Sequence, residues 1–182
     1  MHYVISASPN ADGLTAACAE AAARGIEGAG GSAARLDLCA LKIKGCMVCG
    51  NGWGTCRESH ACCIEDGLRE MQIDLSECEG LFLVTPVYWG MPSERMKSFM
   101  DRFRRCEAIR GEEGALAGKR VNLVAAAGGS GNGTVTCLAD MENWCRHLRA
   151  IPHHRLGVTR FNREGLLSAI EAAGAESASA NR

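Results

Sequence analysis

Two adjacent aromatic residues, Tyr88 and Trp89, stand in the segment 86–90, which reads PVYWG. The segment follows the apolar run 80–85 and precedes an amphipathic stretch that begins near Pro92. We therefore expect a loop between a strand and a helix, where aromatic side chains are not needed to fill a core. Because the carboxyl ends of the strands form the ligand crevice of an open α/β sheet, this pair is positioned to face a flat, partly apolar ligand.

The segment 8–15, which follows the first apolar run, carries residue types that suit a phosphate. The hydroxyls of Ser8 and Thr15 and the amide of Asn10 can donate hydrogen bonds, and a helix beginning here adds free N–H groups and the positive end of its dipole. No Lys or Arg lies between Ser6 and Thr15, so these dipoles would balance the phosphate charge. Since the same residues are good helix caps, an ordinary capped turn is the alternative.

A third segment, 127–133, reads AGGSGNG and follows the fourth apolar run. Its glycines permit positive φ and let the backbone come close to a ligand, although a flexible connection is the alternative. In a sheet of order 2-1-3-4-5, strands one, three and four are neighbours at the switch point, so the three segments meet there. One suits a phosphate, one an aromatic ring and one backbone hydrogen bonds, and FMN has parts for all three.

The elements that position these segments alternate between strand-like and helix-like patterns. Helical periodicity is clearest over residues 93–106, where Met96 and Met100 fall on the apolar face and are expected in the core. Continuous apolar strands indicate a parallel sheet covered by helices on both faces. Strands are predicted over 3–6, 33–38, 81–84, 121–126 and 156–159, and further helices over 14–25, 134–148 and 164–172. The sequence thus predicts one α/β domain over residues 1–173 with a five-stranded parallel sheet of order 2-1-3-4-5, and a frayed tail over 174–182.

Length and composition are those of an ordinary globular chain. The 182 residues suit a single domain, and hydrophobic residues make up 47% of them and charged residues 23%. The formal net charge of -1 gives no reason to expect nucleic acid or a membrane surface as a partner. Because the chain starts with a strand-like run and has no signal-type leader, we expect cytoplasmic residence. In a reducing compartment its eleven cysteines would serve as packing residues, metal ligands or redox groups.

Three motifs together resemble the flavodoxin-like NADPH-dependent FMN reductase family, including its cysteine-bearing relatives, the iron-sulfur flavoproteins. They are SPNADGLT at 8–15, TPVYWGMPSERMKSFMDR at 85–102 and AGGSGNG at 127–133. The resemblance covers most of residues 1–135, and its most specific part is the aromatic loop followed by the K-x-F-x-D-R helix. It implies a flavodoxin-like three-layer α/β/α sandwich and a homodimer with the flavin near the subunit boundary.

The resemblance also implies noncovalently bound FMN, NAD(P)H as co-substrate and a small electron acceptor such as a quinone or another flavin. The cofactor carries such chemistry, so no catalytic side chain is expected. The implied phosphate residues are Ser8, Asn10, Gly13, Leu14 and Thr15, and the implied ring residues are Pro86, Val87, Tyr88, Trp89, Gly90, Gly128 and Gly129. Many members have a G-N-T triplet at the positions that correspond to 13–15 of this chain. Leu14 has no side-chain amide, so at this position only its backbone N–H can donate a hydrogen bond to the phosphate.

The segment 41–64 interrupts the alternation and holds five cysteines. Cys46 and Cys49 begin a motif of metal-binding type, and the third position expected for an iron-sulfur relative is Gly52. Cys56 with either Cys62 or Cys63 can complete four thiolates, and the set taken as metal ligands is Cys46, Cys49, Cys56 and Cys63. Zinc is a further possibility. The irregular spacing favours a reduced loop whose thiols pack near the flavin or the dimer partner.

A cluster in this segment would suit a second kind of protein, an electron-transfer flavoprotein without NAD(P)H activity of its own.

Two other groups of residues could take part in the chemistry but also have simpler explanations. His153 and His154 stand just before the last predicted strand and are either proton donors or simply exposed. Asp101 and Arg102 are expected to form a structural pair at the end of their helix.

Overall fold

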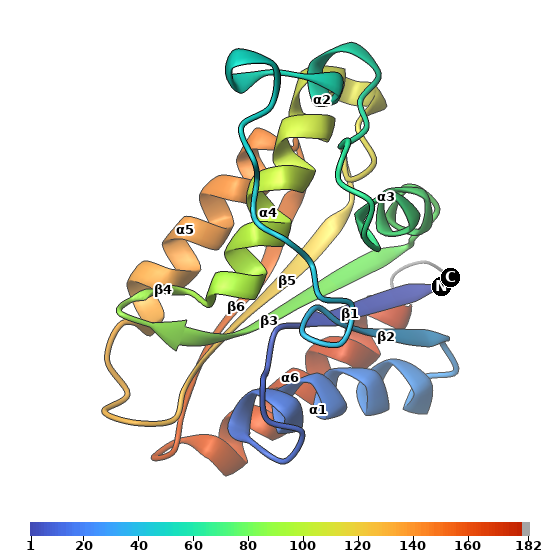
Figure 1. Cartoon of the computed structure of the whole chain (residues 1–182). Coiled ribbons are helices and arrows are strands. Elements are labelled where there is room, and N and C mark those ends of the chain that lie inside the picture. The colour runs from blue at the N-terminus through green and yellow to red at the C-terminus, as the bar shows by residue number, and fades with distance from the viewer. Residues whose placement is uncertain (180–182) are drawn as a thin grey trace.

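The computed structural model of the chain describes residues 1–179, which form a mostly parallel sheet with helices on both faces (Figure 1). The parallel strands follow the order β2-β1-β3-β5-β6, and the short β4 pairs antiparallel with β3. The strands are β1 (His2–Ser6), β2 (Ala33–Asp37), β3 (Gly80–Tyr88), β4 (Met91–Pro92), β5 (Arg120–Ala127) and β6 (Ile151–Thr159). The helices are α1 (Leu14–Gly28), α2 (Thr55–Glu58), α3 (Leu68–Ser76), α4 (Glu94–Glu107), α5 (Thr134–His147) and α6 (Arg163–Ser179), with short η1 (Gly50–Gly52) and η2 (Ala108–Glu113).

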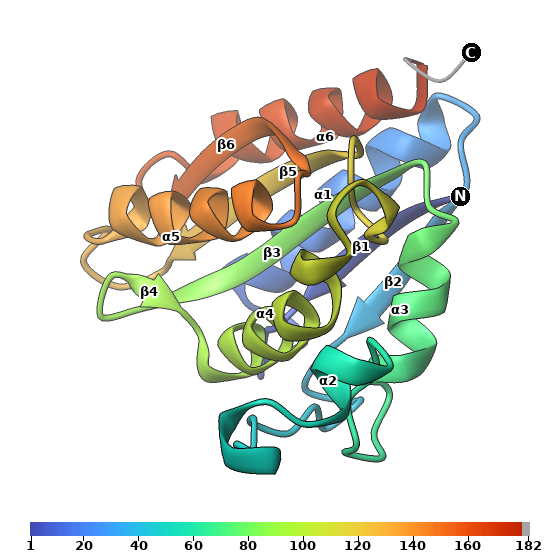
Figure 2. The ribbon, with the colours of Figure 1, turned by 90° about the horizontal axis from the view of Figure 1, so that it is seen from above.

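When the five long strands are numbered along the chain without the short β4, their order in the sheet is 2-1-3-4-5. This order confirms the predicted flavodoxin-like sheet. Helices α1 and α6 cover one face, and α3, α4 and α5 cover the other (Figure 2). Each face of the sheet has its own hydrophobic core, and alternate residues of β3 contribute to each. Leu81 and Leu83 pack on the side of α4, and Phe82 packs on the opposite side with residues of α1. Met96 and Met100 are buried in the first of these cores, as predicted.

The segment 86–90 is a hairpin rather than a plain strand-to-helix loop. β3 runs on to Tyr88, and Tyr88 pairs with Met91 of β4. The two residues of the turn, Trp89 and Gly90, have φ of 53° and 78°. Two-residue hairpin turns with both φ values positive match the twist of the strands that they join. The sequence prediction missed β4 because two residues carry no periodic pattern.

The structure differs from the C-terminal prediction at residues 174–179, which form the last turns of α6 rather than an irregular tail. Small residues let α6 lie directly against α1: a Cβ on Gly174 would come 2.5 Å from the carbonyl oxygen of Ala22, and one on Gly25 would come 1.9 Å from that of Glu171. Ser177 is buried as well. Residues 180–182 of the predicted tail lie outside the described residues.

One further prediction needs correction. His153 and His154 lie inside β6 rather than in a loop before it. Segment 41–64, which interrupts the predicted alternation, contains η1 and α2, and α2 packs against α4. Over residues 1–179, no helix combines the length and the apolar character needed to cross a membrane.

Candidate functional site

The loop between β1 and α1 ends in an uncapped helix N-terminus. Gly13 precedes α1 without a side-chain cap, and the first intrahelical bond runs from Ala17 N–H to the Gly13 carbonyl at 3.0 Å. The N–H groups of the first helical turn therefore have no acceptor within the helix. Ser8 folds the preceding turn, since its hydroxyl donates to the carbonyl of Asn10 at 2.7 Å and accepts from the N–H of Asn10 at 3.2 Å. Such a helix end suits an anion.

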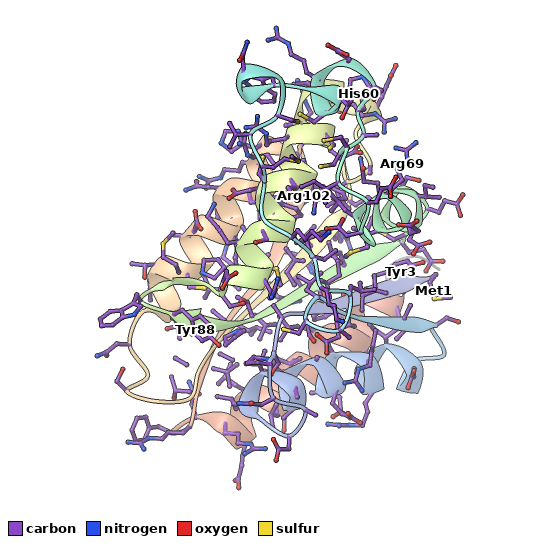
Figure 3. The ribbon with its side chains drawn as sticks, viewed as in Figure 1. Met1, Tyr3, His60, Arg69, Tyr88 and Arg102 are labelled. Atoms are coloured by element: carbon purple, nitrogen blue, oxygen red, sulfur yellow. The ribbon has the colours of Figure 1, made fainter. Side chains whose placement is uncertain are left out.

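The hairpin turn carries an unusual residue for its conformation. Trp89 has φ of 53°, and its side chain is fully exposed. A bulky residue in the left-handed region is strained, and such strain gathers at functional sites. Neighbouring Tyr88 is half exposed at the carboxyl end of β3 (Figure 3). Neither aromatic ring is used to fill the core.

The hairpin and the glycine loop that follows β5 are in direct backbone contact. A Cβ on Gly133 would lie 2.7 Å from the Cα of Gly90, so only glycine permits this approach. The hydroxyl of Thr136, in the first turn of α5, lies 2.8 Å from the carbonyl oxygen of Gly90 and 3.1 Å from that of Gly133. These contacts fix the position of one loop relative to the other.

All three segments line two adjoining pockets at the carboxyl edge of the sheet. A pocket of about 270 Å³ is bounded by Ser8, Pro9, Asn10, Gly13, Leu14, Thr15, Pro86, Val87, Tyr88, Ala126, Gly128 and Gly129. A second, of about 500 Å³, is bounded by Val87, Trp89, Gly90, Ala127, Gly128, Gly129, Ser130, Asn132 and Gly133. The structure thus brings together every residue predicted for the phosphate and for the ring, and it adds Ser130 and Asn132, which the sequence prediction missed although they lie inside its glycine motif.

The space beside Gly128 and Gly129 shows whether the pocket can accept a flat ligand. Neither has positive φ, and a Cβ added to either would meet no protein atom within 4 Å. Neither the backbone conformation nor the packing of the chain therefore requires glycine at these positions. The open space beside these two glycines leaves their backbone N–H groups available to a planar molecule, which fits the ring of FMN. The uncapped end of α1, which borders the same pocket, fits its phosphate.

A separate pocket is lined by thiols. Its walls are Cys46, Met47, Cys49, Thr55, Cys56, Cys62, Cys63, Ile64, Arg102, Arg105 and Cys106. The four predicted metal ligands are all among them, and Cys62 and Cys106 are two more thiols. Cys106 lies on α4, outside the insert, so nothing in the spacing of the insert pointed to it. Within the insert, Cys63 Sγ is 3.6 Å from Cys49 Sγ.

Three arginines of α4 hold the insert in place. Arg95 donates to the carbonyl of Ile43 at 2.9 Å, and Arg105 lies over the ring of Trp53 at 4.2 Å. Arg102 is buried between α4 and the segment that leads to α3 (Figure 3). Their spacing of seven and three residues puts these arginines on one stripe of the helix.

Arg102 makes a buried ion pair with Asp66, so the predicted pairing of Arg102 with Asp101 was wrong. Its two terminal nitrogens reach the Asp66 carboxylate at 2.5 and 3.0 Å, and its Nε donates to Cys62 Sγ at 3.3 Å. Asp101 instead pairs with Lys97 at 2.6 Å on the surface. Burial opposes the charge of Asp66, but hydrogen bonds from Arg102 and from the N–H of Lys44 lower its pKa overall.

The thiol pocket is small, and the pKa values of two of its thiols, Cys49 and Cys106, are raised. The hydrogen bond with Cys63, together with partial desolvation, raises the pKa of Cys49. Burial raises the pKa of Cys106 to about 12. The volume of the pocket is about 10 Å³, about the space of one water. Its donor types suit a thiolate-bound metal, but among residues 1–179 no three of its sulfurs lie within 4.8 Å of one another, so binding a metal ion or a cluster requires the insert to rearrange.

The elements that line the two kinds of pocket lie near opposite ends of α4: the β3–β4 hairpin lies near its start and α2 near its end (Figure 1). Ser93 and β4 stand at the start of the helix, beside the loop pockets, and Cys106 stands near its end. A helix of 14 residues is about 20 Å long. The thiols of one chain are therefore not packed against the loop pockets of the same chain, contrary to one alternative drawn from the sequence.

The sheet order, the two helical layers and the pockets at the carboxyl edge define a flavodoxin-like protein. The profile of the family described as NADPH-dependent FMN reductase matches residues 3–160, so the chain belongs to that family. Among solved structures, the NAD(P)H:quinone oxidoreductase from Methanothermobacter marburgensis is similar in fold, with a TM-score of 0.72 and 18% identity over 96% of this chain and 94% of that one.

Curated relatives match a smaller part of the chain. An iron-sulfur flavoprotein of Methanocaldococcus jannaschii is 31% identical over 100 residues, which are 55% of this chain and 50% of the relative. An iron-sulfur flavoprotein of Archaeoglobus fulgidus is 29% identical over 98 residues, which are 54% of this chain and 43% of the relative. The chain therefore matches about half the length of these relatives.

Proposed function

We propose that the protein binds FMN in the two loop pockets and acts as an NAD(P)H-dependent oxidoreductase toward a quinone, another flavin or a similar small acceptor. The observation that carries this proposal is that segments 8–15, 86–90 and 127–133 line two adjoining pockets at the carboxyl edge of the sheet, which share Val87, Gly128 and Gly129. When bound, FMN supplies the hydride-accepting and electron-donating chemistry. Membership of the FMN reductase family supports the same cofactor.

The chain's own residues would bind, orient and shield the ligand. The N–H groups of the first turn of α1 would hold the phosphate, together with Ser8 and Thr15. Backbone N–H groups of Gly128 and Gly129 would stabilise negative charge that develops on the ring. Tyr88 would lie beside the ring, and Trp89 would bound the open space where a second substrate enters.

We also propose a homodimer in which a second copy covers the loop pockets. Support comes from large apolar side chains that are exposed around them: Trp89 fully, Met91 at 44% and Val135 at 77%. These residues belong to the hairpin and to the start of α5, which contact each other. Sedimentation of the wild type and of Val135→Glu tests this: the variant should dissociate, and a monomeric wild type would contradict the proposal.

The proposed activity is tested by a visible spectrum recorded without oxygen, before and after NADPH is added. We expect resolved flavin bands that bleach within the mixing time of a manual experiment. Bands that bleach only with dithionite would contradict the reductase and support an electron carrier. A colourless protein that cannot take up FMN would overturn both.

A second function is favoured by the thiol pocket, since six cysteines gather in one place. In this version the protein is an electron-transfer flavoprotein with a thiolate-bound metal or iron-sulfur cluster and no NAD(P)H activity of its own. A bound cluster would supply one-electron chemistry. The names of the curated relatives point the same way.

Metal analysis after anaerobic purification tests the second function. A cluster predicts iron and acid-labile sulfide in proportion, and Cys49→Ser should remove both, whereas Cys39→Ser, a partly exposed thiol outside the pocket, should not. Stoichiometric zinc without sulfide would identify a structural ion. A protein free of both metals would leave the pocket as a reduced thiol site.

A further inference from the structure

A β-bulge on the edge strand turns two consecutive histidines toward one helix. β5 and β6 pair Val121 with Pro152 and Leu123 with Arg155, so the single residue between them on β5 faces both His153 and His154. Consecutive side chains of a regular strand point to opposite faces, and an extra residue at a bulge breaks that alternation.

Both imidazole rings reach the same carboxylate of α6. His153 Nε2 lies 3.5 Å from Glu176 Oε1, and His154 Nε2 lies 3.1 Å from Glu176 Oε2. The two ring centroids are 4.3 Å apart, with the rings nearly perpendicular. The ligand atoms of the three residues all lie within 4.8 Å of one another, and no other trio of Cys, His, Asp or Glu in residues 1–179 meets that limit.

We propose that His153, His154 and Glu176 bind one divalent transition-metal ion. Two imidazoles and a carboxylate suit Zn²⁺, Ni²⁺ or Co²⁺, and three protein ligands leave a position for water. Ligands that sit about 2.0–2.1 Å from a tetrahedral ion are about 3.3 Å from each other, and the two histidine-to-glutamate separations, 3.5 and 3.1 Å, are close to that value. Neither the flavin site nor the thiol pocket uses any of the three residues.

The surroundings hold both halves of this site in register. Asn122, which faces the two histidines across the sheet, accepts from the N–H of His154 at 3.3 Å and donates to Ser177 Oγ at 3.0 Å. One side chain therefore ties the histidine strand to the residue next to Glu176. The histidine side chains are 25% and 32% exposed, so an ion can enter from solvent.

The position of the site indicates a structural role. His153 and His154 lie in the first half of β6, away from the carboxyl end of that strand and from the loop pockets. Glu176 lies in the last turns of α6. An ion here would fasten the end of α6 to the edge strand of the sheet and would stabilise the folded chain in proportion to its concentration, because it binds only the folded state.

Charged groups around the three residues allow a test in which one substitution should lower the metal affinity and another should raise it. Burial, the neighbouring ring of His154 and Arg120 all lower the pKa of His153, and Glu176 raises it. Removing the carboxylate should therefore weaken binding of a cation, and removing the positive charge of Arg120 should strengthen it. A simple ion pair between imidazolium and carboxylate binds no metal and predicts no effect of either change on metal affinity.

The experiment is a Co²⁺ titration of untagged, chelator-treated protein without oxygen, followed by absorption. Cobalt bound by thiolates gives intense charge-transfer bands, whereas cobalt bound by nitrogen and oxygen gives only weak d–d bands, so the two sites are distinguished. Loss of a residue that merely supports a ligand weakens metal binding about 10–100-fold. We therefore expect Glu176→Gln, which removes a ligand itself, to weaken cobalt binding at the nitrogen and oxygen site by about 100-fold or more. Glu171→Gln, on the same helix and paired with Arg24, is the matched control and should change nothing.

His154→Gln provides an independent variant should Glu176→Gln disturb α6. It is expected to remove the same d–d bands and the same metal-dependent gain in thermal stability, and Arg120→Gln is expected to increase affinity. Absence of a nitrogen and oxygen cobalt site in the wild type would overturn the proposal. So would equal affinities of the Glu176→Gln and Glu171→Gln proteins.

Discussion

The two ends of α4 carry sites that are built in different ways. At its start, the loop pockets are made of backbone: an uncapped helix, a two-residue turn and a run of glycines. At its end, the thiol pocket is made of side chains that come from the insert and from α4 itself. The first site depends on the sheet, which fixes where the strands end, and the second depends on a few long side chains that hold an irregular segment.

This difference predicts that damage at one end of α4 will not spread to the other. The insert is held by Arg95, Arg102 and Arg105, none of which lines the loop pockets. The loops are held by the contact between Gly90 and Gly133 and by Thr136. Substitutions chosen at each end can therefore break or sharpen the comparison.

The largest effect is expected for Arg102→Met. It leaves the carboxylate of Asp66 buried without its partner, and breaking a buried ion pair in this way costs about 3–5 kcal/mol of the free energy of unfolding. Urea denaturation measures this cost. The control is Lys97→Met, which breaks the exposed pair with Asp101 on the same helix and should cost about 1 kcal/mol or less.

FMN affinity should be unchanged in the fraction of Arg102→Met that remains folded. If that variant were no less stable than Lys97→Met, the buried pair would not hold the insert. If it folded but no longer bound FMN, the two ends of α4 would not be independent.

The second effect is expected for Gly128→Val, at the other end. A Cβ at this position meets no protein atom within 4 Å, so the stability of the protein without flavin should change little. The same side chain would occupy the proposed ring space, and we expect FMN affinity to fall about 10–100-fold, or about 1.4–2.7 kcal/mol. Fluorescence titration with FMN measures it, and Gly165→Val, at an equally open position on α6, serves as the control for binding. Unchanged affinity would show that the flavin does not lie against Gly128.

A smaller effect is expected from pH. Burial raises the pKa of Asp66, but its hydrogen bonds with Arg102 and the backbone lower it overall, below its ordinary value. A carboxyl whose pKa is lower in the folded state stabilises the fold above its unfolded pKa of about 3.9, and this contribution is lost as the pH falls through the folded pKa. The difference in free energy of unfolding between wild type and Asp66→Asn should be constant near neutrality and shrink below about pH 4. A difference that stayed constant to pH 3 would contradict the ion pair.

The smallest effect on stability is expected for Trp89→Gly. Glycine adopts positive φ without strain but has more freedom in the unfolded chain, so the two effects offset each other to within about 1 kcal/mol. Binding of the second substrate should weaken, because Trp89 bounds the space where it would enter. Steady-state kinetics should show a raised KM for a quinone with FMN content unchanged, and an unaltered KM would remove Trp89 from the substrate site.

The sheet and the loop pockets were predictable from sequence because both follow from the ends of apolar strands. Runs such as 80–85 and 121–126 mark where strands end, and the residues that come next must meet at one edge. The hairpin at Trp89 and the bulge at His153 were not predictable, because each depends on register between strands rather than on the pattern of one strand. The thiol pocket was predicted only in part, since Cys106 and the arginine stripe reach it through the packing of α4.

Hydrogen exchange measured by mass spectrometry, with and without FMN, tests the proposal of one flavin site built from three loops most directly. Peptides that cover 8–15, 86–90 and 127–133 should all gain protection on adding FMN, and peptides that cover 46–63 should not. Protection of only one of the three loops, or protection centred on 46–63, would contradict a single flavin site at the carboxyl edge of the sheet.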